Sequence, residues 1–222
     1  MSFKLRNFVT KLHLKTSRNY VERMKNKKVF CMKIAREYSE DYWDGKRSYG
    51  YGGYKFIDSY WKPVAINLIK TYKLKENSKI LDVGCGKGYL LYEIKKLLPK
   101  IKVFGFDISS YAIKNSKKEI KKNLVVRNIN KKFPYKKKYF DLCISLGVLH
   151  NLQIQQIAHS IKEINRVSKN QYVMVESYRN EQELFNLQCW ALTCESFFKP
   201  IEWEYIFKKY GFKGDFEFIY FK

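Results

Sequence analysis

The clearest pattern along this chain is a series of short apolar runs that alternate with amphipathic stretches. The apolar runs cover residues 79–83, 103–107, 124–127, 139–146 and 172–178. Each has the length and composition of a strand that is buried on both faces. Between them, apolar residues recur at helical spacing, as at Ile157, Ile161 and Ile164. Strands that alternate with helices predict an α/β fold with a parallel sheet.

A glycine-rich turn follows the first predicted strand, in the sequence Leu81-Asp82-Val83-Gly84-Cys85-Gly86-Lys87-Gly88. Glycine lets the backbone turn sharply and lets a ligand approach closely, and the next helix presents free amides at its start. The dinucleotide fingerprint needs its third glycine one place later, where this chain has Tyr89. About twenty residues further on, the second strand ends in Asp107, where an acid can bind both hydroxyls of a ribose.

These two elements together resemble the class I (Rossmann-like) S-adenosylmethionine-dependent methyltransferases. Another nucleotide-binding α/β fold is the alternative. The resemblance implies a doubly wound, mostly parallel sheet of seven strands, or of six, since only one clear strand follows Gly211. It implies S-adenosyl-L-methionine as cofactor and S-adenosyl-L-homocysteine as product. The cofactor contacts that it implies are Asp82, Gly84, Cys85, Gly86, Gly88, Asp107, Ile108, Asn128, Ile129, Ser145 and Leu146. For Asn128, a role as a turn former is equally compatible with the sequence.

We predict two parts of the chain: residues 1–60 as a helical extension and lid, and residues 61–222 as the cofactor-binding core, with residues 180–198 as an insertion that completes the substrate pocket. Phe3 to Leu14 suggest an amphipathic helix, packed on its own domain or lying on a membrane or RNA. Tyr20 to Tyr38 suggest a second helical stretch. Residues 42–56 mix tyrosines and Trp43 with glycines, which favours a lid over the cofactor; an aromatic packing loop is the alternative.

Candidate catalytic residues are those at the carboxyl ends of the later strands, where open parallel sheets bind ligands. His150 follows the fourth strand, and Glu176 and Tyr178 end the fifth. His150 would take a proton from the acceptor or serve the structure, and Glu176 would act as base, substrate anchor or structural acid. The predicted substrate contacts are Arg47, Tyr49, Tyr51, Tyr54, Arg179 and Glu195.

Composition limits the remaining choices. The 222 residues carry a formal net charge of +23, which would suit an anionic partner, but the lysines are spread along the whole chain, so nucleic acid is disfavoured without being excluded. Five cysteines without a C-x-x-C pair, and three histidines, predict reduced thiols and no metal site. No apolar run approaches the ~18 residues of a membrane span, and the start of the chain lacks a signal sequence, so we expect a cytoplasmic protein.

The function that the sequence favours is methyl transfer to a small polar, anionic acceptor bearing a carboxylate, phosphate or sugar. Surface-polysaccharide or secondary-metabolite biosynthesis in a bacterium would use such an enzyme. One alternative is an RNA or protein methyltransferase that uses the basic surface; another is a non-catalytic cofactor-binding partner subunit. No Asn-Pro-Pro-Tyr or Asp-Pro-Pro-Tyr follows the fourth strand, which disfavours amide and base-amine methylation. The sequence also allows a homodimer.

Overall fold

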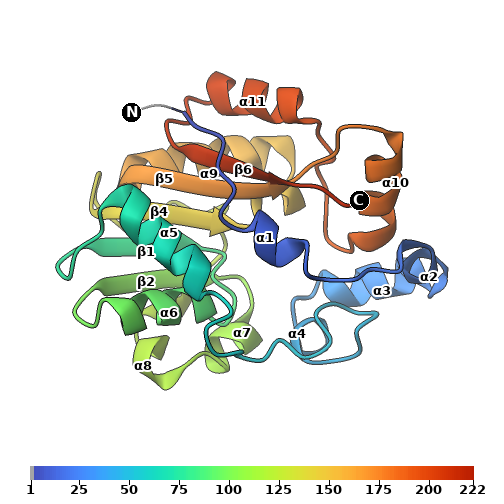
Figure 1. The fold of residues 1–222 in the computed structure, drawn as a ribbon, viewed down its shortest axis with the longest axis horizontal. Coiled ribbons are helices and arrows are strands. Elements are labelled where there is room, and N and C mark those ends of the chain that lie inside the picture. The colour runs from blue at the N-terminus through green and yellow to red at the C-terminus, as the bar shows by residue number, and fades with distance from the viewer. Residues whose placement is uncertain (1–2) are drawn as a thin grey trace.

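The computed structural model describes residues 3–222, and its centre is a sheet of six parallel strands in the order β3-β2-β1-β4-β5-β6 (Figure 1). The strands are β1 (Lys79–Val83), β2 (Lys102–Asp107), β3 (Leu124–Val126), β4 (Phe140–Leu146), β5 (Ser168–Glu176) and β6 (Asp215–Ile219). The order reverses between β1 and β4, so the carboxyl ends of these two strands flank a crevice. The predicted α/β fold is confirmed, with six strands.

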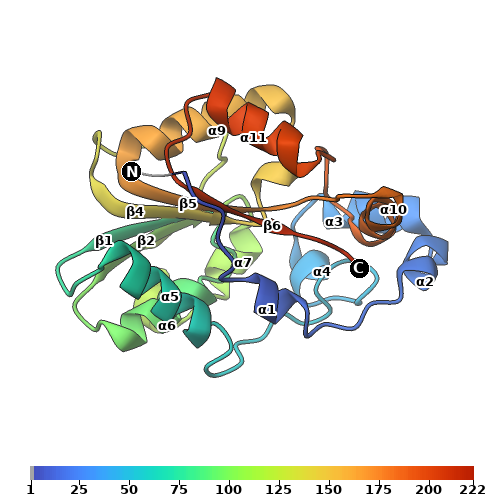
Figure 2. The ribbon, with the colours of Figure 1, turned by 45° about the horizontal axis from the view of Figure 1, so that its top comes forward.

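Helices cover both faces of the sheet, as Figure 2 shows with the sheet seen nearly edge-on. One face carries α5 (Lys62–Tyr72), α6 (Tyr89–Leu97), α7 (Ser110–Lys114) and α8 (Lys118–Lys121), and the other carries α9 (Ile154–Val167) and α11 (Pro200–Lys209). Each face has its own apolar core. Leu68, Leu91 and Ile94 lie in one, and Ile161, Trp203 and Phe207 in the other, and all six are at most 1% exposed.

The start of the chain lies along the outer edge of β6. Leu5 forms a parallel bridge with Phe216, whose carbonyl accepts a 2.7 Å hydrogen bond from the Arg6 amide. The amphipathic helix predicted for residues 3–14 is therefore wrong; only α1 (Thr10–His13) is helical there. The reason is long-range: the buried Glu217 carboxylate accepts amide hydrogen bonds from residues 8, 9 and 10, which draws this segment onto the sheet edge.

Four helices gather beyond the carboxyl ends of the strands, as Figure 1 shows. They are α2 (Tyr20–Lys25), α3 (Lys28–Ala35), α4 (Glu40–Trp43) and α10 (Glu181–Trp190). The helical stretch predicted for residues 20–38 is thus present but broken at Lys27, which has a left-handed backbone (φ 44°). Because α2 packs against α10, these helices, together with residues 14–19 before α2 and residues 44–60, form a roof over the crevice. We call this group of residues the roof.

Candidate active site

A cavity of about 640 Å³ lies between the carboxyl ends of the strands and the roof. Its floor includes Asp82, Gly84 and Gly86 from the glycine turn, and Leu146 and Glu176 from the ends of β4 and β5. Its mouth is bordered by aromatic and apolar side chains that are well exposed, among them Tyr51, Ile57 and Tyr60. The volume falls in the range of pockets that bind small molecules.

The glycines of the turn have distinct roles. Gly84 and Gly86 have positive φ angles of 79° and 54°. A Cβ atom added to Gly84 would lie 2.2 Å from Val148, and one added to Gly86 would lie 2.7 Å from the Trp43 ring. Side chains would therefore both strain and obstruct the turn. Gly88 differs, because its added Cβ would meet Ile120 at 2.7 Å; it serves helix packing and does not line the cavity.

Two carboxylates lie beside the turn. The Asp82 carboxylate lines the cavity and accepts no hydrogen bond from residues 3–222. Burial raises its pKa to about 8, with a further contribution from the charge of Asp107. The Asp107 carboxylate, in contrast, accepts 2.8 Å hydrogen bonds from the amides of Gly86 and Ser109. Asp107 thereby ties the end of β2 to the glycine turn.

Trp43 separates the Asp107 end of the crevice from the cavity. Its indole contacts Gly86, donates a 2.9 Å hydrogen bond to Ser109 Oγ and stacks on Tyr51 with ring centroids 5.2 Å apart. The predicted cofactor contacts beyond it do not line the cavity. Those residues are Asp107, Ile108, Asn128 and Ile129.

Three of the residues predicted to contact the cofactor have other roles in the structure. Asn128 accepts a hydrogen bond from the Asn130 amide, the turn-forming role that was the alternative. Ile129 packs in the core beside Phe133. Ser145 is fully buried and donates to the Val83 carbonyl at 3.0 Å, so it joins two strands and does not reach the cavity.

The residues around the turn fit S-adenosylmethionine in their chemistry. The cofactor is cationic at its sulfonium and at its α-ammonium, and Asp82 offers an unpaired carboxylate in the cavity. Gly84 and Gly86 leave backbone accessible for close approach. Asp107 retains lone pairs for ribose hydroxyls once the Trp43 ring is displaced.

His150 and Glu176 form one unit. The Glu176 amide donates a 3.1 Å hydrogen bond to His150 Nδ1, which assigns the proton of the neutral ring to Nε2. Nε2 then faces the Glu176 carboxylate at 3.4 Å. Burial lowers the pKa of His150, although Glu176 raises it in part. Both residues line the cavity. Since neither nitrogen of His150 is free to accept a proton, Glu176 is the better candidate base.

Four residues predicted to bind substrate or act in catalysis lie elsewhere. Arg179 pairs with Glu183 and lies over the Tyr220 ring, and the Tyr178 ring lies beneath Lys199 Nζ. Glu195 pairs with Arg36 at 2.8 Å, while Tyr49 packs against Phe30. None of these four lines the cavity, whereas the predicted Arg47, Tyr51 and Tyr54 do.

The sequence did not indicate two of the arginines that line the cavity, Arg18 and Arg23. Trp190, from the end of α10, also lines it and belongs to residues 180–198, the segment predicted to complete the substrate pocket. Arg23 Nε donates to the Trp190 carbonyl across 167 positions of sequence. No local pattern marks such pairs, and in a chain this basic an arginine is weak evidence by itself.

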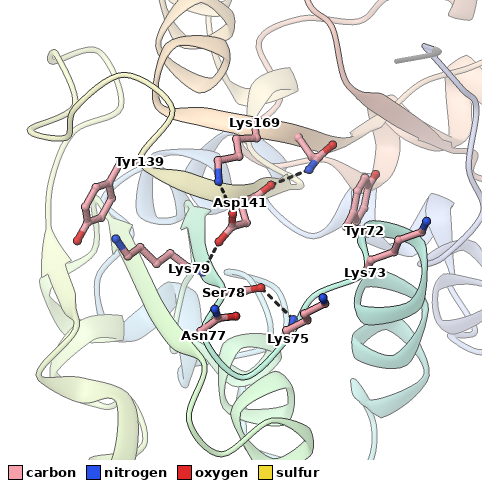
Figure 3. Close-up of a pocket in the computed structure, with 10 residues that line it drawn as sticks. Tyr72, Lys73, Lys75, Asn77, Ser78, Lys79, Tyr139, Asp141 and Lys169 are labelled. Atoms are coloured by element: carbon pink, nitrogen blue, oxygen red, sulfur yellow. Dashed lines mark hydrogen bonds and ion pairs between the residues drawn. The ribbon is translucent and has the colours of Figure 1, made fainter.

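A second cavity, about 440 Å³, lies at the opposite, amino-terminal ends of β1 and β4. Figure 3 shows Asp141 there between Lys169 and the backbone of Lys79. Asp141 accepts 2.8 Å hydrogen bonds from Lys169 Nζ and from the Lys79 amide. These bonds join the starts of β1, β4 and β5, so we interpret this site as structural.

Within residues 3–222, no three His, Cys, Asp or Glu side chains are grouped closely enough to hold a metal ion. No helix in the same range combines the length and apolar character of a membrane span.

The chain matches a family model described as "Methyltransferase domain" over residues 74–211, more than half of its length. It belongs to this family. The predicted class, an S-adenosylmethionine-dependent methyltransferase with a Rossmann-like fold, and its cofactor are thereby confirmed. The fold is also similar to that of a methyltransferase solved in complex with the Haloferax volcanii Trm112 activator. That structure has a TM-score of 0.52 and 19% identity, and the similarity covers 69% of this chain and 73% of that one.

Curated relatives match only part of this chain. A tRNA U34 carboxymethyltransferase from Nautilia profundicola is 35% identical over 103 residues, covering 43% of this chain and 33% of that protein. A tRNA (carboxymethyluridine(34)-5-O)-methyltransferase from Arabidopsis thaliana is 34% identical over 125 residues, covering 55% of this chain and 29% of that protein. The match thus spans about a third of the length of these relatives.

Proposed function

We propose that this protein transfers a methyl group from S-adenosylmethionine to a small polar, anionic acceptor that enters the roofed cavity. The observation that carries the proposal is the shared cavity itself. Asp82 and the glycine turn line its floor, while Arg18, Arg23 and Arg47 line its roof. The cavity therefore offers a carboxylate to a cationic cofactor and guanidinium groups to an anionic acceptor.

The cofactor supplies an electrophilic methyl carbon, and the protein's contribution is to position the acceptor and hold its proton. Glu176 lines the cavity and would accept a proton from an acceptor hydroxyl or amine. His150, protonated at Nε2, orients that carboxylate. Tyr51 and Tyr54 would form an apolar and aromatic wall for the acceptor.

The test is a screen in which the protein, S-adenosylmethionine with a labelled methyl group, and panels of phosphorylated, carboxylated and neutral metabolites are incubated together. We expect label transfer to at least one anionic metabolite, and a slower transfer with Glu176→Gln. Transfer to neutral metabolites alone would contradict the proposal.

A second candidate is methylation of RNA, which the names of the tRNA-directed relatives and the net charge of +23 support. Against it, Lys55 is the one lysine among the described residues that line the cavity, so the lysines do not cluster there. Bulk tRNA in the same labelling assay separates the two candidates: label in tRNA, with none in the metabolite panels, would favour this second function.

A further inference from the structure

Three arginines converge on one tryptophan in the roof of the cavity. The guanidinium carbons of Arg18, Arg23 and Arg47 lie 5.3, 4.8 and 5.0 Å from the centroid of the Trp190 ring. Contact with an aromatic face holds a guanidinium in a fixed orientation through cation–π attraction. All four residues line the cavity. We call Arg18, Arg23, Arg47 and Trp190 the arginine cluster.

The arginine cluster is held in place by backbone carbonyls. Arg18 Nη1 donates to the carbonyls of His13 and Thr16, and Arg47 Nη1 donates to those of Gly50 and Tyr51. Arg23 Nε donates to the Trp190 carbonyl at 3.3 Å. These bonds fix the three side chains without neutralising their charge.

The hydrogen bonds that hold the arginine cluster in place do not use all of its N–H donors. Arg18 Nε is buried and has no hydrogen-bond partner within residues 3–222. Leaving a buried charged donor unpaired is costly, and none of the three arginines forms an ion pair with a carboxylate in that range. The guanidinium charges of the arginine cluster therefore have no acidic partner among the described residues.

The charge of the cavity lining supports an anionic occupant. Its cationic side chains are Arg18, Arg23, Arg47 and Lys55, and its carboxylates are Asp82 and Glu176. This leaves two positive charges in excess when both carboxylates are ionised, and three when Asp82 is protonated, which its raised pKa of about 8 favours at neutral pH. His13 adds none near neutral pH, because burial and the charge of Arg18 lower its pKa to about 4, against a raising effect of the Tyr220 carbonyl. Burial also lowers the pKa of Arg23 to about 10, with help from Arg47, so the cations are packed closely without compensation.

We propose that the arginine cluster binds a phosphate monoester group of the methyl acceptor. Guanidinium groups pair bidentately with phosphate oxygens, and a dianion compensates two of the excess positive charges of the lining. A single carboxylate would neutralise only one of them. The inference rests on the proposed function, because it identifies the anionic group of the same acceptor.

This placement orients the acceptor. Its phosphate lies in the roof against Trp190, and its reactive hydroxyl or amine points to the floor, where Glu176 and Leu146 border the cavity beside the glycine turn. The acceptor therefore carries its phosphate at a distance from the atom that is methylated. The enzyme that supplies this acceptor must be one that forms or retains a phosphate monoester, such as a kinase.

The test is calorimetric titration of the protein with inorganic phosphate, and separately with malonate, with and without saturating S-adenosylhomocysteine. The variant is Arg18→Gln/Arg47→Gln. Its matched control is Lys136→Gln/Lys137→Gln, which removes the same charge from an exposed loop remote from the cavity. We expect phosphate to bind the wild type more tightly than malonate does, the cluster variant to bind it at least tenfold more weakly, and the control to bind it within twofold of the wild type.

Three results would overturn the proposal: no phosphate binding to wild-type protein, equal loss in the control variant, or malonate binding as tightly as phosphate. Tighter binding of a short single-stranded RNA than of phosphate, lost in the cluster variant, would also overturn it in favour of a backbone phosphodiester. Since wild-type titrations decide most of these outcomes, a folding defect in the variant does not obscure them. Failure of S-adenosylhomocysteine to bind, with phosphate still bound, would contradict the proposed function alone.

Discussion

The environment of Asp82 indicates which kind of ligand the cavity binds. Its carboxylate lies on the floor with no hydrogen-bond donor from the described residues, and burial followed by the charge of Asp107 raises its pKa to about 8. A buried ionised carboxylate without a partner costs free energy. We infer that the protein accepts this cost in order to present the carboxylate to a cationic ligand.

The raised pKa of Asp82 predicts that the stability of the folded protein depends on pH. The folded protein holds the Asp82 proton more tightly than the unfolded chain, so wild-type stability falls as pH rises from about 4 to about 8. Asp82→Asn removes the ionisation. We expect the free energy of unfolding of the variant, relative to that of wild type, to rise by at least ~1.4 kcal/mol from pH 5 to pH 9, the equivalent of a shift of one pKa unit. Urea unfolding of both proteins at pH 5 and pH 9 measures this change. A difference in stability between variant and wild type that is the same at both pH values would refute the raised pKa of Asp82.

Glu176 and His150 divide the proton chemistry between them. Glu176→Gln should lower kcat by about 10²-fold or more, the contribution of a general base, with unchanged affinity for S-adenosylhomocysteine. His150→Gln retains an N–H donor and should lower kcat less. The pH profile of kcat/KM separates the roles: its acidic limb should vanish in Glu176→Gln and persist in His150→Gln. The reverse pattern would make His150 the base.

At the scale of elements, the roof is fastened to the core by a partly buried ion pair. Lys87 Nζ lies 2.7 Å from both carboxylate oxygens of Asp44 and donates to the Tyr54 carbonyl at 2.9 Å. The Tyr111 hydroxyl adds a 2.8 Å hydrogen bond to the same carboxylate. The Lys87 side chain is only 4% exposed. These bonds hold Trp43, the neighbour of Asp44, against the glycine turn.

Breaking this ion pair should loosen the roof. Asp44→Asn leaves the Lys87 charge buried without its partner, so we expect a loss of about 3 kcal/mol in the free energy of unfolding and faster amide exchange in residues 38–56. The matched control is Asp58→Asn, since Asp58 pairs with Lys96 on the exposed surface, where solvent screens the charges and such a pair contributes little to stability. Equal losses in the two variants would show that the Asp44 pair does not fasten the roof.

The elements also show what local sequence predicts and what it does not. The glycine turn and the strand before it were predictable, because their spacing and apolar runs are set by neighbouring residues. Residues 3–14 were predicted wrongly, because a carboxylate at Glu217 decides their conformation from 207 or more positions away. Arg179 was misplaced for a related reason: it lies just beyond β5, but Glu183 on the next helix pairs with it.

For the whole molecule, the order of the strands explains where the site lies. The strand order of the sheet reverses between β1 and β4. The carboxyl ends of these two strands face the roof helices α2, α3, α4 and α10 (Figure 1). Family membership rests on residues 74–211. The roof comes largely from residues before that range, so under the proposed function much of the acceptor site would lie outside the part of the chain that the family model covers.

We infer that the cavity beside the glycine turn binds the cofactor through Asp82. Calorimetric titration with S-adenosylhomocysteine is the decisive experiment, with Asp82→Asn as the variant and Asp141→Asn, from the amino-terminal ends of the strands, as the control. We predict binding to the wild type, at least tenfold weaker binding to Asp82→Asn, and binding within twofold of wild type for Asp141→Asn. Absence of binding to the wild type, or equal affinity in both variants, would contradict the account.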